Sequence, residues 1–189
     1  MSFGDRLKTF FDQVRSIVMT PRDAFPTLKT EAAEVQTLYR EYGLFLAAMP
    51  AIGYILDFSS YLGFGTRIRL ALMTFVFVLV MFYVSAFIVD FLAQYFDSQS
   101  GLTNAFKLVL YAMTPCLVAG IFSFLGGLGT LIGWAGGIYS LYLFFIALPV
   151  FMETPDAKVL LYMLASILTS MVASFILGSV FTAIFGVSM

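Results

Sequence analysis

The chain has 189 residues, of which 61% are hydrophobic and 11% are charged, and its mean hydropathy is +0.97. Soluble domains carry about 25% charged residues, so this composition predicts an all-α integral membrane protein with one compact helical domain. The net charge of −1 argues against nucleic acid as a partner. There is no histidine and only one cysteine, which excludes a zinc ligand set and a histidine-dependent catalytic pair. We therefore expect no metal, no cofactor and no enzymatic activity.

The first 37 residues are predicted to form a cytoplasmic amphipathic region. Apolar residues recur at helical spacing from residue 3 to residue 18, and the other side of this helix carries charges. Such a helix suits the lipid headgroup layer, and packing on the rest of the protein is the alternative. Thr20 and Pro21 predict the start of a second helix that ends near Leu28. The polar residues 29–37 then lead to the membrane.

Residues 38–189 are predicted to form a membrane domain with five transmembrane helices. The first span, residues 39–58, has a charge-free run that is shorter than usual and contains Pro50. A re-entrant segment is the alternative there. The second span, residues 68–92, surrounds an apolar run between Arg69 and Asp90 that is long enough to cross a bilayer.

The longest charge-free stretch, residues 108–152, is predicted to fold as a helical hairpin. At roughly 1.5 Å per residue, one helix of this length would be about twice as long as the ~30 Å hydrocarbon layer is thick. Glycines interrupt the stretch near its middle, and Gly costs a helix about 1 kcal/mol relative to Ala. These glycines are Gly126, Gly127, Gly129 and Gly133. We therefore expect spans at residues 107–125 and 131–152, followed by a fifth at residues 159–183. The single cysteine, Cys116, lies within the hairpin and is expected to be a small buried hydrophobe.

The distribution of basic residues predicts the orientation. With a cytoplasmic N-terminus, only Arg67 and Arg69 of the 10 Lys and Arg residues lie outside. Five spans then place the C-terminus on the opposite side of the membrane.

Gly129, Gly133 and Gly137 are candidate helix-packing residues because they recur at every fourth position. Small residues at this spacing let another helix backbone approach closely. The approaching helix belongs either to the same chain or to a second copy in a homo-oligomer.

Pro50, Pro115 and Pro149 are candidate kinks because each falls in a predicted span. Such kinks occur in plain bundles and also in transporters, where broken helices line a site. Asp90 is the candidate intramembrane acid, since apolar residues continue past it. The alternative places Asp90 at the cytoplasmic interface, because the preceding apolar run already suffices to cross the membrane.

Short segments along most of the chain form a pattern in a fixed order. The first group is Pro21, Ala24, Phe25, Lys29 and Glu31, followed by Leu38, Tyr39, Tyr42 and residues 46–51. The second group is residues 111–115, residues 138–142, Leu148 with Pro149, and residues 155–158. Taken together, these segments resemble the bacterial inner-membrane branch of the Yip (Ypt-interacting protein) family. The resemblance implies a five-span, multi-pass helical fold with a cytoplasmic N-terminus. In a bacterial inner membrane, an odd number of spans then puts the C-terminus in the periplasm. Eukaryotic members are associated with Rab-type GTPases, but their acidic-Leu-x-Gly-Pro motif is absent here.

Two functions remain compatible with these observations. The first is a non-enzymatic protein that organises membranes or binds partners through its Gly-rich hairpin. Its partners would be membrane lipid and either a second copy or another membrane protein. The alternative is a small transporter, channel or accessory subunit that uses the kinked spans and Asp90.

Overall fold

The computed structural model describes residues 3–31, 34–57 and 63–185, and these residues form helices and connecting turns without a strand. Two helices come first, α1 (Phe3–Met19) and α2 (Pro21–Thr30). The bundle begins with α3 (Val35–Leu38), the π-helical turn η1 (Tyr39–Gly43) and α4 (Leu44–Leu56). It continues with α5 (Phe64–Ala93), α6 (Leu102–Ala112), α7 (Thr114–Gly120) and the 3-10 turn η2 (Ile121–Leu125). It ends with α8 (Gly127–Phe151) and α9 (Asp156–Phe185). The all-α prediction is confirmed.

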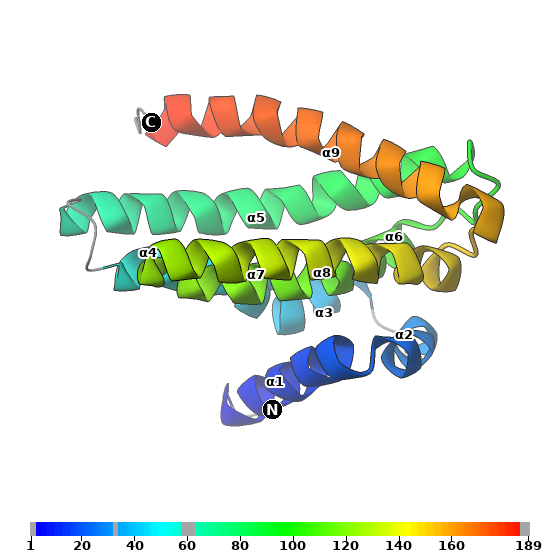
Figure 1. Cartoon of the computed structure of the whole chain (residues 1–189), viewed down its shortest axis with the longest axis horizontal. Helices are drawn as coiled ribbons and strands as arrows, with labels where there is room; N and C mark the ends of the chain where they lie inside the picture. The colour runs from blue at the N-terminus through cyan, green and yellow to red at the C-terminus, as the bar shows by residue number, and fades with distance from the viewer. Residues whose placement is uncertain (1–2, 32–33, 58–62, 186–189) are drawn as a thin grey trace.

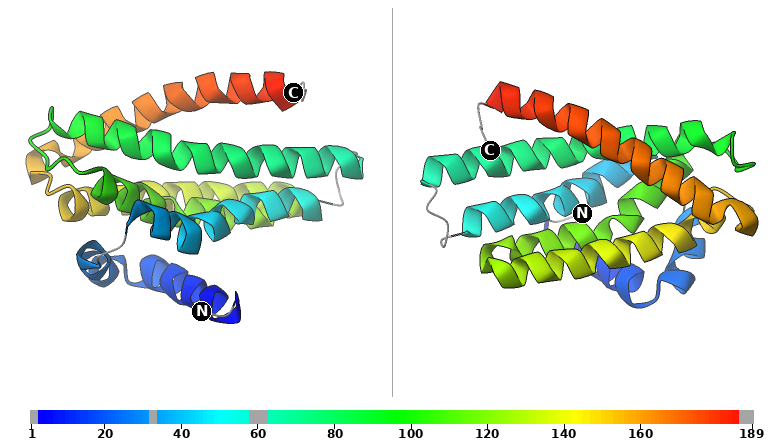
Figure 2. Two further views of the ribbon diagram at one scale, coloured as in Figure 1. Left: turned by 180° about the vertical axis from the view of Figure 1, so that it is seen from behind. Right: turned by 45° about the horizontal axis from the view of Figure 1, so that its top comes forward.

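The helices lie in layers, and α5, α7 and α8 run along the long axis of the molecule, whereas α2 runs across it (Figure 1). α5 and α9 run antiparallel on one side of the molecule, and α1 and α2 form a separate layer on the opposite side (Figure 2). α4, α6, α7 and α8 lie between these layers. The connections after α5 and α8 are at the same end of the bundle as α2, whereas the turn before α8 and the end of α9 are at the other.

α6 is the centre of the core. Every residue from Ala105 to Ala112 is buried, because neighbouring helices cover this helix on all sides. Large aromatic side chains fill the space around it, including Phe82 of α5 and Phe151 of α8. A helix that is buried on every side in this way needs neighbours on every side, and its one buried charge, Lys107, needs polar partners.

The structure contains three unbroken helices that are long and apolar enough to cross a membrane: Phe64–Ala93, Gly127–Phe151 and Asp156–Ile184. Leu102–Ala112 and Thr114–Leu125 meet at an angle of 44°, and they make a fourth span if the bent pair crosses as one. The described residues thus contain three or four clear candidate spans instead of the five predicted. The predicted first span is not among them because η1 interrupts its helix, and its predicted end, Phe58, lies outside the described residues.

The hairpin turn lies where the glycines predicted it. Gly126 has φ +60°, a conformation that residues with a side chain rarely adopt. α8 begins directly afterwards, at Gly127 and not at Leu131, so Gly127 and Gly129 belong to the helix. A Cβ at Gly129 would collide with the carbonyl of Phe122, and this close approach lets η2 and α8 pack together at the turn. Helix–helix packing therefore outweighs the low helix propensity of glycine here.

The apolar face of α1 packs on protein, the second of the two arrangements compatible with its sequence. Phe10 and Ile17 are fully buried, and the Phe10 ring lies 5.1 Å from that of Tyr42. α2 starts at Pro21 as predicted, but Thr20 does not cap it with its side chain. The Thr20 hydroxyl instead donates to the Ser16 carbonyl of the preceding helix, at 3.2 Å.

Candidate functional site

The break between α6 and α7 brings together polar groups from three parts of the chain. Thr114 is fully buried, and its Oγ1 lies 2.8 Å from the Tyr42 hydroxyl of η1. The Thr114 hydroxyl is also 3.2 Å from the Leu110 carbonyl, to which it donates. The Tyr111 ring stands edge-on to Tyr42, and Gln13 of α1 donates to the Tyr111 hydroxyl. These bonds satisfy polar groups that an apolar interior would otherwise leave unpaired.

Lys107 joins the N-terminal layer to the bundle. This α6 side chain is only 2% exposed. Its ammonium donates to the carbonyls of Leu28 at 2.9 Å, Lys29 at 3.0 Å and Glu31 at 2.6 Å. The last carbonyls of a helix have no partner within the helix and carry partial negative charge, so a buried cation complements the end of α2.

Two ion pairs lie at the same end of the bundle. Lys29 at the end of α2 is 2.7 Å from Glu153, which follows α8. Lys158 of α9 pairs with Asp97, which follows α5. Both acids have positive φ, at 51° for Glu153 and 53° for Asp97, so the tight turns that end α5 and α8 point their side chains toward these lysines.

The glycines of α8 lie on two different sides of the helix. Gly136 packs inside the chain, since an added Cβ would be 2.7 Å from the Ala119 Cβ and 2.8 Å from the Pro115 carbonyl. A Cβ added at Gly133 or Gly137 would meet no described atom of another helix within 4 Å. Of the three glycines singled out by spacing, only Gly129 therefore makes a close contact with another described helix.

A second close helix contact, between α4 and α7, was not predicted from the sequence. A Cβ at Gly120 would lie 2.8 Å from the Pro50 Cβ. A Cβ at Gly53 would overlap the Ser123 hydroxyl and come 2.5 Å from the Gly120 carbonyl. These two glycines are far apart in sequence and have no regular spacing, so no one-helix pattern could have paired them.

The three prolines occupy different settings. Pro115 is the second residue of α7, directly after the 44° bend, and Pro50 and Pro149 lie inside α4 and α8. Next to Pro115, the Cys116 backbone N–H donates to the Ser140 hydroxyl of α8 at 3.0 Å. Cys116 itself is exposed on the outer side of α7, so the expectation of a buried cysteine was wrong.

Asp90 is half-buried near the end of α5. Its Oδ1 accepts a hydrogen bond from the Gly101 backbone N–H at 2.6 Å. Gly101 is the residue that caps the start of α6, so the carboxylate closes the loop between the two helices. On the preceding residue, the Val89 carbonyl accepts a hydrogen bond from the Tyr162 hydroxyl of α9. Among the described residues, no group of three or more His, Cys, Asp or Glu side chains could hold a metal ion.

We expect Asp90→Ala to lower the free energy of unfolding by about 1–3 kcal/mol, because the Gly101 N–H loses its acceptor. Asp90→Asn should be nearly silent, since the amide oxygen still accepts this bond. Thermal unfolding of the detergent-solubilised variants measures the difference. Equal melting temperatures for the Ala and Asn variants would contradict this role of the carboxylate.

Comparison with known families places these contacts in a shared domain. The family model described as the Yip1 domain matches residues 15–178. This chain belongs to the Yip1 domain family. Neither a curated protein nor a solved structure matches it.

The Yip1 domain match starts within α1 and ends within α9. It therefore includes both the Lys107 contact with α2 and the α4–α7 glycine contact. Sequence reasoning counted Lys107 only as a basic residue that orients the membrane domain. Its position directly before an apolar helix gave no indication that its ammonium would cap a helix some eighty positions earlier.

Proposed function

We propose that this Yip1-domain protein is a non-enzymatic membrane protein that associates with a second copy of itself and thereby organises its membrane or its partner proteins. The observation that carries this proposal is the open side of α8. Gly133 and Gly137 lie one helical turn apart on this side, with no described atom of another helix near the position of a Cβ.

The surroundings of these glycines favour a helix as the partner. Leu131, Trp134 and Ile138 are 66% to 71% exposed beside them. A helix from a second copy could approach the glycine backbone closely and pack its side chains against these flanking residues. Among the described residues, the close glycine contacts of α8 with other helices are made by Gly129 and Gly136, and none is made at Gly133 or Gly137.

We further propose that the chain crosses the membrane five times. α3, η1 and α4 follow one another without a gap from Val35 to Leu56. At about 1.5 Å per residue, this helix is roughly 33 Å long, which suffices for a hydrocarbon layer of ~30 Å. The grouping of the helix connections at two opposite ends supports alternating spans (Figure 1).

We place the α2 end of the bundle in the cytoplasm of a bacterial cell, with the protein in the inner membrane and the C-terminus in the periplasm. Lys29, Lys107 and Lys158 all lie at this end. Basic residues accumulate on the cytoplasmic side of membrane proteins.

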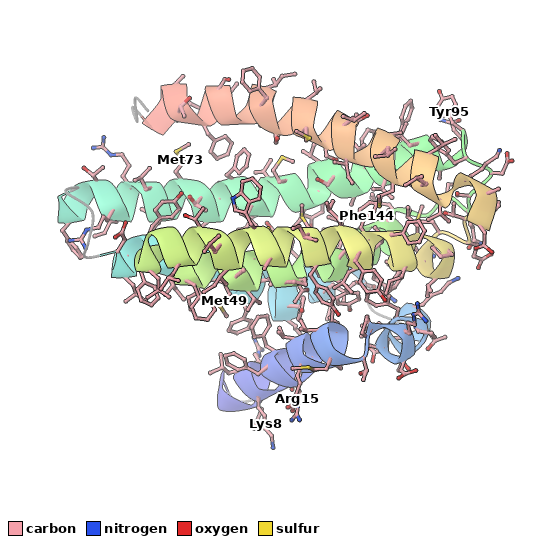
Figure 3. The ribbon with its side chains drawn as sticks, in the orientation of Figure 1. Lys8, Arg15, Met49, Met73, Tyr95 and Phe144 are labelled. Carbon is pink, nitrogen blue, oxygen red and sulfur yellow. The ribbon has the colours of Figure 1, made fainter. Side chains whose placement is uncertain are left out.

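Membrane lipid is the second proposed partner, through α1. Lys8 and Arg15 are exposed and project away from the bundle (Figure 3). Phe11 and Met19 are also exposed, at 54% and 73%. Basic and apolar side chains together on one helix surface suit an anionic headgroup layer.

The bend between α6 and α7 is the feature that favours the alternative, a small transporter, channel or accessory subunit. If that function used Asp90, its carboxylate would exchange its hydrogen-bond partner with the transported species. The Asp90 carboxylate is instead hydrogen-bonded to the α6 cap. This arrangement supports the organising function.

The proposal is tested by native mass spectrometry and by concentration-dependent cross-linking of the detergent-solubilised protein. We expect a homodimer for the natural sequence. Gly133→Leu and Gly137→Leu should each weaken it by about tenfold or more, or about 1.4 kcal/mol, because a branched side chain separates the helix backbones.

Gly127→Leu is the matched control, since Gly127 likewise has no close contact with another described helix but lies at the first turn of α8. It should leave the dimer unchanged. A natural chain that is monomeric at every concentration, or Leu variants that associate as before, would overturn the proposal. Stoichiometric binding of a different membrane protein in place of the second copy would also overturn it.

A further inference from the structure

A cavity of about 330 Å³ lies among α5, α6, α7, α8 and α9. Its wall extends along α5 from Phe77 to Val89, a rise of roughly 18 Å. Phe144 contributes from the side of α8 that faces α5 and α9 (Figure 3). Met113, Leu141 and Met171 line the cavity and are 38% to 61% exposed, so it opens to the outside between helices that we place in the bilayer.

Two of the hydroxyls in this wall are deeply buried. Ser85 of α5 is 4% exposed and Ser166 of α9 is 2% exposed. The side-chain oxygen of each lacks a partner among the described residues. A buried hydroxyl without a partner costs about 1–3 kcal/mol, and native structures contain few of them. This cost is a reason to expect that a ligand satisfies the two hydroxyls.

The other hydroxyls nearby show that Ser166 is unusual. In a membrane helix, Ser and Thr commonly donate to a carbonyl one turn earlier. Thr169, Ser174 and Ser179 of α9 do so, at 2.8 to 2.9 Å. Ser140 of α8 also lines the cavity, but it accepts the Cys116 N–H. Among the described residues that line the cavity, the buried hydroxyls without a partner are those of Ser85 on α5 and Ser166 on α9.

The composition of the wall limits the chemistry of the ligand. Its lining residues are apolar or carry hydroxyls, and none of them is charged. A charged headgroup would lose its hydration here without a counter-ion, so an ionised fatty acid or a phosphate is disfavoured. A plain hydrocarbon chain would fill the space but would leave both hydroxyls unpaired.

We propose that the cavity binds an uncharged lipid with an apolar body and at least one hydrogen-bonding oxygen, which Ser85 of α5 and Ser166 of α9 recognise. A long-chain alcohol and an isoprenoid quinone share this chemistry. The hydroxyl of an alcohol can both donate a hydrogen bond to a serine oxygen and accept one from a serine hydroxyl. The carbonyl oxygens of a quinone can only accept hydrogen bonds from the two serine hydroxyls. Gly133 and Gly137, the glycines of the proposed self-association, do not line this cavity, so the two proposals rest on different residues.

The test compares three probes, each of which is added to the purified protein in detergent solution. Phytol carries one hydroxyl, phytane is the same branched hydrocarbon without it, and decylubiquinone carries ring carbonyls. Native mass spectrometry and ligand-dependent thermal shift report binding. We expect phytol or decylubiquinone to bind at least tenfold more tightly than phytane. Whichever of these two binds more tightly shows whether the oxygen belongs to an alcohol or to a quinone.

Ser85→Ala and Ser166→Ala should each weaken binding of the oxygen-bearing probe by about tenfold and leave phytane unchanged. Both variants should fold at least as well as the natural chain, because each removes an unpaired buried hydroxyl. Ser174→Ala is the matched control: Ser174 lines the same cavity, but its hydroxyl donates to Met171. Equal binding of phytol and phytane, no binding of any probe, or binding that ignores both serine replacements would overturn the proposal.

Discussion

Replacement of Lys107 by methionine is expected to release α2 from the bundle and to lower the free energy of unfolding by about 3 kcal/mol. Methionine keeps the length and apolar stem of lysine but cannot donate. The carbonyls of Leu28, Lys29 and Glu31 would then lose a charge-assisted donor together. For a chain of this size, the melting temperature should fall by on the order of 10 °C.

Limited trypsin digestion distinguishes loss of α2 from general unfolding. Arg22 and Lys29 are cleavage sites on α2, which the Lys107 contact holds against the bundle. In Lys107→Met, cleavage at these sites should accelerate at temperatures well below the main unfolding transition, because α2 opens locally. The membrane helices should remain intact at that stage.

Glu153→Gln is the matched control for this variant. It removes the ion pair with Lys29, which also links α2 to the bundle, but both partners are partly exposed. An exposed ion pair contributes about 1 kcal/mol or less, so its loss should change cleavage little. If Lys107→Met and Glu153→Gln behave alike, the buried ammonium is not what holds α2.

The fold was predictable wherever the composition of one segment decides its structure. The length and charge-free runs of α5 and α9 allow few alternatives to a span, and the glycines around Gly126 mark the hairpin turn. The start of α2 followed from Pro21, whose fixed φ suits the first helical residue.

Features that depend on contacts between distant segments could not be predicted in this way. The interruption at η1 has no marker in residues 39–43, and it removes the first predicted span from the unbroken helices. The partners of Lys107 and the pairing of Gly53 with Gly120 depend on how helices lie beside one another. The spacing of Gly129, Gly133 and Gly137 correctly marks a helix with small residues, but it does not tell which side faces the chain.

Gly136 marks the side of α8 that faces the chain, and Gly136→Leu is expected to prevent or severely impair folding. Even the Cβ of alanine would lie within 3 Å of the Ala119 Cβ and the Pro115 carbonyl. The carbonyl belongs to backbone and cannot rotate away, so α7 and α8 would have to separate. Overpacking usually costs about 1–3 kcal/mol, and we expect Gly136→Ala to fall in this range and Gly136→Leu to exceed it.

The neighbouring glycines supply controls on the same helix. Gly133→Ala and Gly137→Ala should keep or slightly raise stability, by up to about 1 kcal/mol, because alanine favours a helix and meets no other described helix there. Thermal unfolding can be followed through Trp134, the single tryptophan of the chain, which lies on α8 between these positions.

This comparison also separates folding from association. Gly136→Ala should lower the melting temperature of the monomer even at a protein concentration in detergent low enough to dissociate a dimer, since its contact is within the chain. The Leu variants at 133 and 137 should instead melt normally under those conditions and lose stability only where the natural chain is dimeric. Similar melting behaviour for all three positions would mean that α8 does not have distinct inner and outer glycine sides.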